Sequence, residues 1–202
     1  MLKRLFQIPL IITVLYACGS SAALRVGEPA PGFEGMDTSG KLQRLADYRG
    51  KTVVLEWTNH DCPFVRKHYG AGNMQEQQRA AAAQGVVWLS IISSAPGKQG
   101  HVSPEEADEL TRTRNAAPLA VILDSDGRIG RAYNAKTTPH MFIIDETGVL
   151  AYMGGMDSIS TANPDDIPQA TQYVRDALQE LAAGKPVSTP VTKPYGCSVK
   201  YQ

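Results

Sequence analysis

The sequence has no excess of charge of either sign, no long hydrophobic run and very little cysteine. Its 20 basic and 20 acidic residues balance, so it lacks the basic surface of a nucleic-acid-binding protein, and we expect no nucleic-acid partner. The apolar run near its start covers only residues 5–17, whereas a membrane-spanning helix needs about 20 residues. Cysteine occurs at positions 18, 62 and 197 alone. We find no internal repeat and no low-complexity segment.

The first 23 residues predict an export leader. Lys3 and Arg4 precede the apolar run, and small residues follow it at positions 19–23. We therefore interpret residues 1–23 as a signal peptide or a lipoprotein leader, which directs the protein to an oxidising compartment such as the periplasm. Residues 15–18, with the sequence Leu-Tyr-Ala-Cys, resemble a bacterial lipobox, although the tyrosine is bulky for that motif. Simple cleavage of the leader and lipidation of Cys18 remain alternatives. A lipid anchor at Cys18 is the only membrane contact that we expect.

The remainder has the length of one domain. Without the leader it holds about 180 residues, enough for a sizeable core, and its 18 basic and 20 acidic residues give a charge of −2. We expect residues 24–184 to form the domain. Residues 185–202 form a tail without periodicity that carries Cys197.

Cys62 stands where a strand passes into a helix. Residues 53–57 form a short apolar run typical of a buried strand, and Pro63 suits the first position of a helix. The free amide groups and dipole of a helix start favour the thiolate, which is the reactive form of cysteine. Glu56 lies inside the buried run, where an ionised carboxylate is costly. It is therefore either on an edge strand or kept for proton transfer.

Other segments alternate between strand and helix patterns. A helix is expected from Asn73 as cap to Gly85, another from the capping box of Ser103 and Glu106 to about residue 115, and a last one over 163–181. We expect extended or hairpin structure within 24–50, and strands over 86–92, 119–123, 140–145 and 149–153. The order of strand, helix and strand around Cys62 predicts a right-handed parallel crossover.

Several motifs together resemble the redoxin branch of the thioredoxin superfamily, the alkyl hydroperoxide reductase and thiol-specific antioxidant-like proteins. Similar proteins carry a buried acid six residues before the active cysteine, as Glu56 does, and a Gly-x-x-Ala-Pro-x-Phe opening, matched by residues 27–33. The match continues through 37–50, Thr138-Pro139 and 142–145. The resemblance implies an α/β, thioredoxin-like fold: a single domain with a central mixed sheet flanked by helices.

The resemblance also implies a substrate groove. Thioredoxin-like proteins keep a cis-proline beside the active cysteine, and Pro139 stands at that place. A sharp turn there leaves backbone free to pair with a substrate chain. We expect the substrate contacts to come from the residues around the turn and the cysteine: Thr138, Pro63, Trp57 and Asn59.

The departures from the family pattern leave the chemistry open. Val65 occupies the place of the second cysteine of a Cys-x-x-Cys pair, so no neighbouring thiol can resolve Cys62. Asn59 and Pro139 replace the threonine and arginine with which typical peroxiredoxins activate peroxide. Cys197 can resolve Cys62 if the tail folds back, because exchange needs only an accessible thiolate. Alternatively, the two cysteines form a static structural disulfide.

Two histidines suggest another alternative. His60 and His140 could join Cys62 in a soft metal site, but three ligands scattered over turns are a weak pattern. We therefore expect no metal and no cofactor.

The sequence thus predicts an exported thiol-disulfide oxidoreductase. Cys62 is the expected nucleophile, Glu56 the proton acceptor, Pro139 the shaper of the groove and Cys197 the resolving thiol. The alternatives are a divergent thiol peroxidase and, as a third hypothesis, a non-enzymatic or metal-binding module with a structural disulfide. The expected partners are a protein disulfide or a peroxide as substrate, and an unidentified thiol as electron donor.

Overall fold

The structure is a computed structural model and describes residues 24–202. The predicted leader, with Cys18, lies outside the described residues. Among the residues described, no helix combines the length and the apolar character that a membrane crossing requires.

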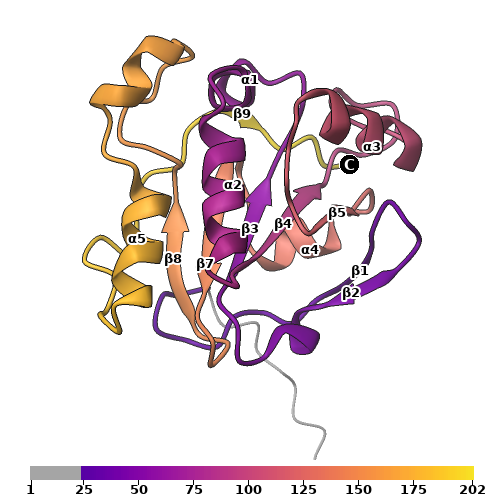
Figure 1. Ribbon diagram of the computed structural model, residues 1–202. Coiled ribbons are helices and arrows are strands. Elements are labelled where there is room, and N and C mark those ends of the chain that lie inside the picture. Colours follow the sequence, from indigo (N-terminus) through magenta and orange to yellow (C-terminus); the bar gives the residue numbers. More distant parts are fainter. Residues whose placement is uncertain (1–23) are drawn as a thin grey trace, which may run out of the picture.

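A five-stranded mixed sheet forms the centre of the molecule (Figure 1). Its strands, in spatial order, are β5 (Ala120–Leu123), β4 (Val87–Ile92), β3 (Val53–Trp57), β7 (His140–Ile144) and β8 (Leu150–Gly154). β3, β4 and β5 run parallel, whereas β7 is antiparallel to both β3 and β8. The predicted α/β fold with a central mixed sheet is confirmed, and so are the parallel pairing of the strands around α1 and α2 and the terminal hairpin.

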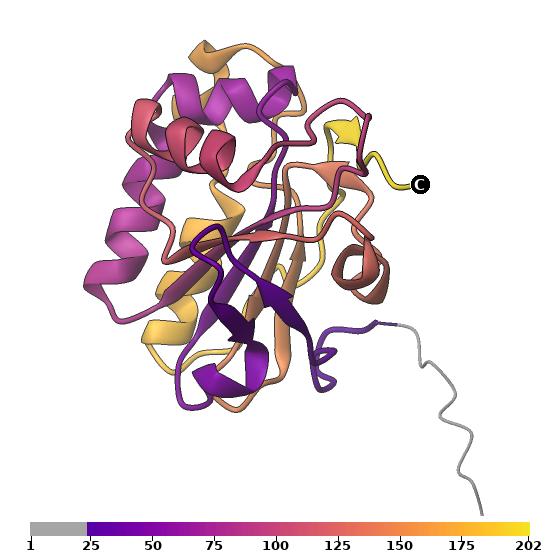
Figure 2. The same ribbon diagram turned by 90° about the vertical axis from the view of Figure 1, so that its right-hand side faces the viewer.

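Helices cover both faces of this sheet, as the side view in Figure 2 shows. The helices are α1 (Pro63–Gly70), α2 (Asn73–Ala83), α3 (Pro104–Thr113), α4 (Arg128–Ala132) and α5 (Tyr173–Ala182). One buried apolar cluster joins α1, α2 and α5 to one face, and a second joins α4 to the other face. α3 packs beside the edge strand β5.

Short elements complete the fold. They are β1 (Glu34–Met36), β2 (Leu42–Arg44), the 3-10 helices η1 (Leu45–Tyr48) and η2 (Pro164–Gln169), and the pair β6 (Thr137–Thr138) and β9 (Cys197–Ser198). β1 and β2 form the hairpin expected within residues 24–50. β9 was not predicted, because two residues of strand have no sequence period to detect. It brings the tail back to the domain by pairing with β6.

β3 owes its apolar sequence to its central place. All five of its residues are buried, because strands flank it on both sides and helices cover both faces. Val53, Leu55 and Trp57 pack into the cluster on the α4 side, and Val54 packs under α1 and α2. Glu56, the one charged residue of the strand, therefore does not lie on an edge strand.

Two helix predictions need correction. Asn73 does not cap α2; Gly72 does, with a left-handed φ of 74° that glycine adopts without steric cost. The single helix expected over 163–181 is two elements, η2 and α5. Pro168 falls inside the first, and because it has no amide hydrogen, an α-helix cannot continue through it. The capping box of Ser103 and Glu106 is present as predicted.

Candidate active site

Cys62 caps the N-terminus of α1. It follows the turn after β3, with an extended backbone, and Pro63 takes the first helical position as predicted. The thiol is completely buried, and its Sγ donates a hydrogen bond to the Thr138 carbonyl at 2.9 Å. The central strand, the turn and the helix start thus hold this sulfur against the segment that precedes β7.

That segment contains the cis peptide bond between Thr138 and Pro139, which confirms the predicted cis-proline. Just before it, β6 pairs antiparallel with β9, and Thr138 lies opposite Cys197 in the register. Gly196 allows this close approach, since a side chain there would meet the Thr138 carbonyl. The structure therefore brings Cys62, Pro139, Thr138 and Cys197 together.

The two thiols have opposite pKa shifts. Burial raises the pKa of Cys62, but hydrogen bonds from Cys197, from the Val65 amide of the first helical turn and from Thr138 outweigh burial and leave the pKa below its usual value. Burial raises the pKa of Cys197, and its hydrogen bond to Cys62 and the negative charge there raise it further. Of the two thiols, Cys62 is therefore the one that ionises more readily, and Cys197 hydrogen-bonds to its sulfur.

Glu56 sits under α1 and α2 in a dense set of donors. Its oxygens accept hydrogen bonds from four buried or largely buried side chains: Tyr69 at 2.8 Å, Trp88 at 2.9 Å, Ser90 at 3.1 Å and Gln78 at 3.2 Å. None of these four partners is a cysteine. Such a set satisfies a buried carboxylate and joins β3 to α1, α2 and β4. The proton-acceptor role of Glu56 stays a prediction.

The residues expected to contact substrate divide into two groups. Pro63 is exposed, whereas Thr138 is buried and its backbone, beside Cys62, pairs with β9. Trp57, in contrast, is 0 % exposed in the core, and its Nε1 donates to Ser93 at 3.0 Å, so the prediction that it contacts substrate is wrong. Asn59 is also buried and accepts a hydrogen bond from the Asp61 amide at 2.9 Å. It shapes the turn before Cys62 and offers substrate no surface.

The histidines do not gather around Cys62. His140 is buried against the Phe142 ring, and its Nδ1 accepts from the Lys136 amide at 3.2 Å. His60 instead lies 3.5 Å from the carboxylate of Asp61. Over residues 24–202, no three His, Cys, Asp or Glu side chains group as a metal ion would require.

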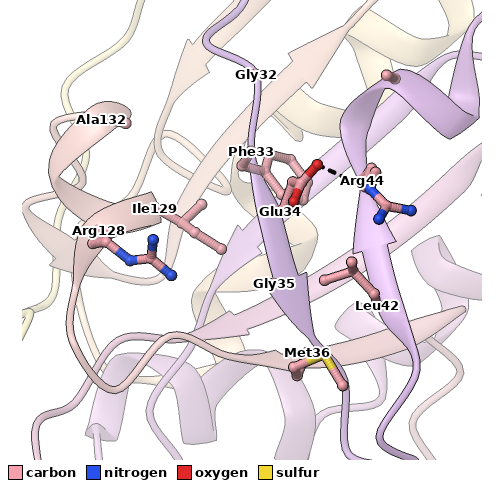
Figure 3. Close-up of a pocket in the computed structure, with 11 residues that line it drawn as sticks. Gly32, Phe33, Glu34, Gly35, Met36, Leu42, Arg44, Arg128, Ile129 and Ala132 are labelled. Carbon is pink, nitrogen blue, oxygen red and sulfur yellow. Dashed lines mark hydrogen bonds and ion pairs between the residues drawn. The ribbon is translucent and has the colours of Figure 1, made fainter.

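A hollow of about 580 Å³ lies elsewhere, between the β1–β2 hairpin and α4 (Figure 3). Arg44 and Arg128 line it together with Ile129, and Glu34 pairs with Arg44 at 2.9 Å. None of the predicted site residues lines this hollow. A smaller hollow of about 430 Å³ lies between His60 and α3, on the side of the turn that leads to Cys62.

Sequence reasoning missed a buried polar cluster behind the site. Lys67 and His68 of α1 contact Asp157 and the tail residue Tyr195. The one available signal was a lysine at a buried position of a helix. A single sequence does not distinguish such a buried lysine from a lysine exposed to solvent. Tyr195 lies only two residues before Cys197.

A cysteine of lowered pKa at a helix N-terminus, a second thiol against it and a cis-proline beside both define a thiol-dependent oxidoreductase of the thioredoxin superfamily. The chain belongs to the AhpC/TSA family, whose family model matches residues 26–153.

Individual relatives point to two activities. The chain is 30% identical over 126 residues to the thiol-disulfide oxidoreductase ResA of Geobacillus kaustophilus (strain HTA426), with 62% of this chain and 67% of the relative covered. It is 29% identical over 192 residues to peroxiredoxin-2 of Macaca fascicularis, with 87% of this chain and 93% of the relative covered. A solved structure of an uncharacterized conserved protein from Geobacillus kaustophilus matches with a TM-score of 0.77 at 25% identity, over 88% of this chain and 93% of the other.

Proposed function

We propose that the protein is an exported thiol-disulfide oxidoreductase in which Cys62 attacks and Cys197 resolves. The observation that carries this proposal is the pairing of β9 with β6, which sets Cys197 opposite Thr138 beside the buried Cys62. With Val65 in the place of a second nearby cysteine, the tail supplies the partner thiol.

In the first step, the Cys62 thiolate attacks one sulfur of a substrate disulfide. A mixed disulfide forms between Cys62 and that sulfur, and the other substrate sulfur leaves as a thiolate. The lowered pKa of Cys62 favours the thiolate form that makes this attack. Pro139 and the Thr138 backbone, once β9 has left it, shape the groove in which the substrate chain lies.

In the second step, Cys197 loses its proton and attacks the Cys62 sulfur. The substrate sulfur bonded to Cys62 leaves as a thiolate, so the substrate becomes a dithiol and the enzyme holds a Cys62–Cys197 disulfide. An external dithiol donor then reduces this disulfide and is itself oxidised. Cys62 is the better leaving group because its pKa is the lower of the two, and Cys197 is the more exposed sulfur. We therefore propose that the donor attacks Cys197.

Access to Cys62 requires movement of the tail. The thiol is 0 % exposed while β9 is paired. When β9 leaves, the backbone of Thr138 can pair with a substrate strand in its place. The same edge thus serves the substrate first and the resolving cysteine afterwards.

The test is a trapping experiment with the reduced protein and a small disulfide-bonded protein. Cys197→Ser should accumulate a mixed disulfide on Cys62, because the resolving thiol is gone. Cys62→Ser should lose all exchange activity. Turnover like that of the wild type without Cys62 would overturn the proposal, and a wild-type Cys62–Cys197 bond that resists mild reductant would favour the structural module.

A divergent thiol peroxidase is the second candidate. The similarity to a peroxiredoxin spans 87% of this chain, and a peroxide is small enough to need only a slight opening of β9. Peroxide would oxidise the Cys62 thiolate to a sulfenic acid, which Cys197 would condense to the disulfide with loss of water. A stopped-flow rate far above that of a free thiol would establish this candidate, and a rate like that of a free thiol would exclude it.

Export rests on the leader pattern of residues 1–23. We propose that the mature chain begins within or after that leader and works in the periplasm. Intact mass of the protein from fractionated cells tests this. A mass that includes lipid on Cys18 would show an anchor, a clean cut after the small residues would show simple secretion, and an uncut chain in the cytoplasm would contradict export.

A further inference from the structure

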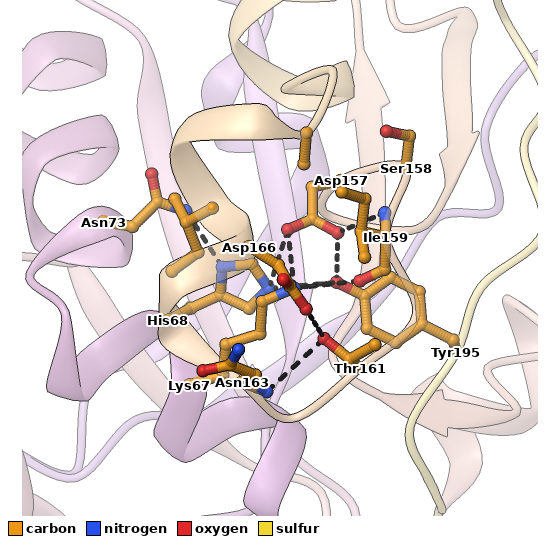
Figure 4. A network of polar contacts seen from close by, with 12 residues as sticks. Lys67, His68, Asn73, Asp157, Ser158, Ile159, Thr161, Asn163, Asp166 and Tyr195 are labelled. Carbon is orange, nitrogen blue, oxygen red and sulfur yellow. Dashed lines mark hydrogen bonds and ion pairs between the residues drawn. The ribbon is translucent and has the colours of Figure 1, made fainter.

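A buried polar cluster ties the tail to α1 just before Cys197 (Figure 4). It consists of Lys67 and His68 of α1, Asp157 from the loop after β8, and Tyr195 of the tail, and we call it the Tyr195 cluster. The side chains of Lys67, His68 and Asp157 are 0 % exposed, and Tyr195 is buried. The mechanism above uses none of them.

Every polar group of this cluster has a partner. The Lys67 ammonium donates to Asp157 Oδ2 at 2.9 Å, to the Ile159 carbonyl at 2.9 Å and to the Tyr195 hydroxyl at 3.4 Å. The Tyr195 hydroxyl in turn donates to Asp157 Oδ1. A buried ion pair of this kind is tolerated because further hydrogen bonds satisfy its remaining donors and acceptors.

His68 completes the arrangement as a neutral ring. The Asn73 amide donates to its Nδ1 at 2.9 Å, so Nε2 carries the proton and faces the Tyr195 hydroxyl at 3.2 Å. Burial lowers the pKa of His68 to about 4, although Asp157 opposes that shift. Tyr195 therefore accepts from Lys67 and His68 and donates to Asp157, and all of its hydrogen-bonding capacity goes to α1 and the Asp157 loop.

The tail reaches Cys62 directly from this anchor. The Phe64 ring, in the first turn of α1, packs edge-on against the Tyr195 ring with centroids 5.8 Å apart. Gly196 follows, and then Cys197, whose backbone pairs with Thr138. Both cysteines are thus held by the same helix, α1: Cys62 is its N-cap residue, and Cys197 is attached to it through Tyr195.

We infer that Tyr195 is a positioning residue, which holds Cys197 over Cys62 through its buried contacts with Lys67, His68 and Asp157. This inference rests on the proposed resolving role of Cys197. An anchored tail keeps the effective concentration of the Cys197 thiol at Cys62 high and favours the intramolecular disulfide.

The experiment measures the Cys62–Cys197 disulfide equilibrium against glutathione in the full chain. Tyr195→Phe keeps the ring and removes the hydroxyl. Since a hydrogen bond to a charged group contributes more than a neutral one, we expect the equilibrium constant for disulfide formation to fall at least about tenfold. That fall equals a rise of about 30 mV in the reduction potential of the pair. The constant falls because β9 is open most of the time in the reduced variant, so alkylation of its Cys62 should approach the rate of an unshielded thiol.

Tyr133→Phe is the matched control. Its hydroxyl donates to the Pro31 carbonyl at 2.6 Å instead of to the tail, so removing it should leave the disulfide equilibrium unchanged. A substitution that destabilises the oxidised and reduced folded forms equally does not change the equilibrium constant for disulfide formation. If Tyr195→Phe gives the wild-type constant, the inference is wrong. If the wild type forms no Cys62–Cys197 disulfide at all, the proposed function fails instead.

A second variant covers the case in which Tyr195→Phe does not fold. Phe64→Leu trims the ring that packs on Tyr195 and leaves the hydrogen bonds of the Tyr195 cluster in place. It should shift the equilibrium in the same direction by a smaller factor. A constant equal to that of the wild type in this variant would count against the inference.

Discussion

The two sulfurs of this protein receive their different chemistry from their places on the backbone. Cys62 has the amide groups of a helix start and a neighbouring thiol to stabilise its negative charge. Cys197 sits on a two-residue strand beside that charge, so its own ionisation is opposed. The proposed division of roles between nucleophile and resolving thiol therefore follows from local electrostatics, although both residues are cysteines.

Glu56 gives a prediction at the scale of one residue. Its carboxylate accepts four hydrogen bonds in the core. In Glu56→Gln an NH₂ group replaces one carboxylate oxygen, so it would face hydrogen-bond donors that then have no acceptor. We expect the free energy of unfolding to fall by about 1–3 kcal/mol, as for other buried donors left without an acceptor. Urea denaturation measures this loss.

The control for that variant is Glu34→Gln. Glu34 lies on the surface and pairs only with the exposed Arg44, so its loss should cost less than about 1 kcal/mol. If Glu56→Gln proves as stable as this control, the hydrogen bonds to the Glu56 carboxylate do not contribute the predicted free energy of unfolding. The rate of disulfide resolution in the folded variant separately tests whether Glu56 accepts a proton, because a purely structural carboxylate would leave that rate unchanged.

At the scale of elements, we propose that the strand pair β6–β9 controls access to Cys62. Gly196→Ala would drive a methyl group into the Thr138 carbonyl, so β9 should pair poorly. We expect alkylation of Cys62 in the reduced protein to accelerate at least about tenfold, the factor that corresponds to about 1.4 kcal/mol. Mass spectrometry of the alkylated peptide gives the rate.

Gly184→Ala separates this effect from backbone strain. Gly184 also has a positive φ, of 67°, but no atom lies near its missing side chain, so the substitution strains the chain without opening β9. Its alkylation rate should match that of the wild type. Equal rates for Gly196→Ala and Gly184→Ala would mean that β9 does not shield Cys62.

The elements also show what a sequence can and cannot predict. The strand before Cys62, the helix start at Pro63 and the capping box at Ser103 follow from local periods and caps, which a single sequence contains. The cis peptide at Pro139 was predictable only through family resemblance. The contact of Cys197 with Thr138 and the burial of Lys67 depend on tertiary pairing between distant segments, for which the sequence has no local signal.

For the whole molecule, two buried histidines predict sensitivity to acid. Burial lowers the pKa of His140 to about 3 and that of His68 to about 4, with Lys136 and Lys67 adding to the shift respectively. In the unfolded chain, both protonate near pH 6.5. Above that pH the folded state has its full stability. As the pH falls from about 6.5 to about 4, the unfolded state binds protons that the folded state excludes, so stability is lost.

Each histidine should cost about 1.4 kcal/mol per pH unit within that window. Urea denaturation between pH 7 and pH 5 measures the slope. His140→Asn keeps an acceptor for the Lys136 amide and removes one titrating ring, so it should roughly halve the slope. A stability that does not change over this range, or that rises as the pH falls, would show that the two rings are not held neutral in the folded state.

The measurement that tests the whole account most directly is a single turnover of the reduced protein. The protein is mixed with one equivalent of a disulfide-bonded protein substrate, quenched with acid and mapped by peptide mass spectrometry. The proposed mechanism requires that each reduced substrate disulfide leaves one Cys62–Cys197 disulfide in the enzyme. Substrate reduced while Cys197 remains a free thiol, or a substrate that stays oxidised beside a reduced Cys62, would contradict it.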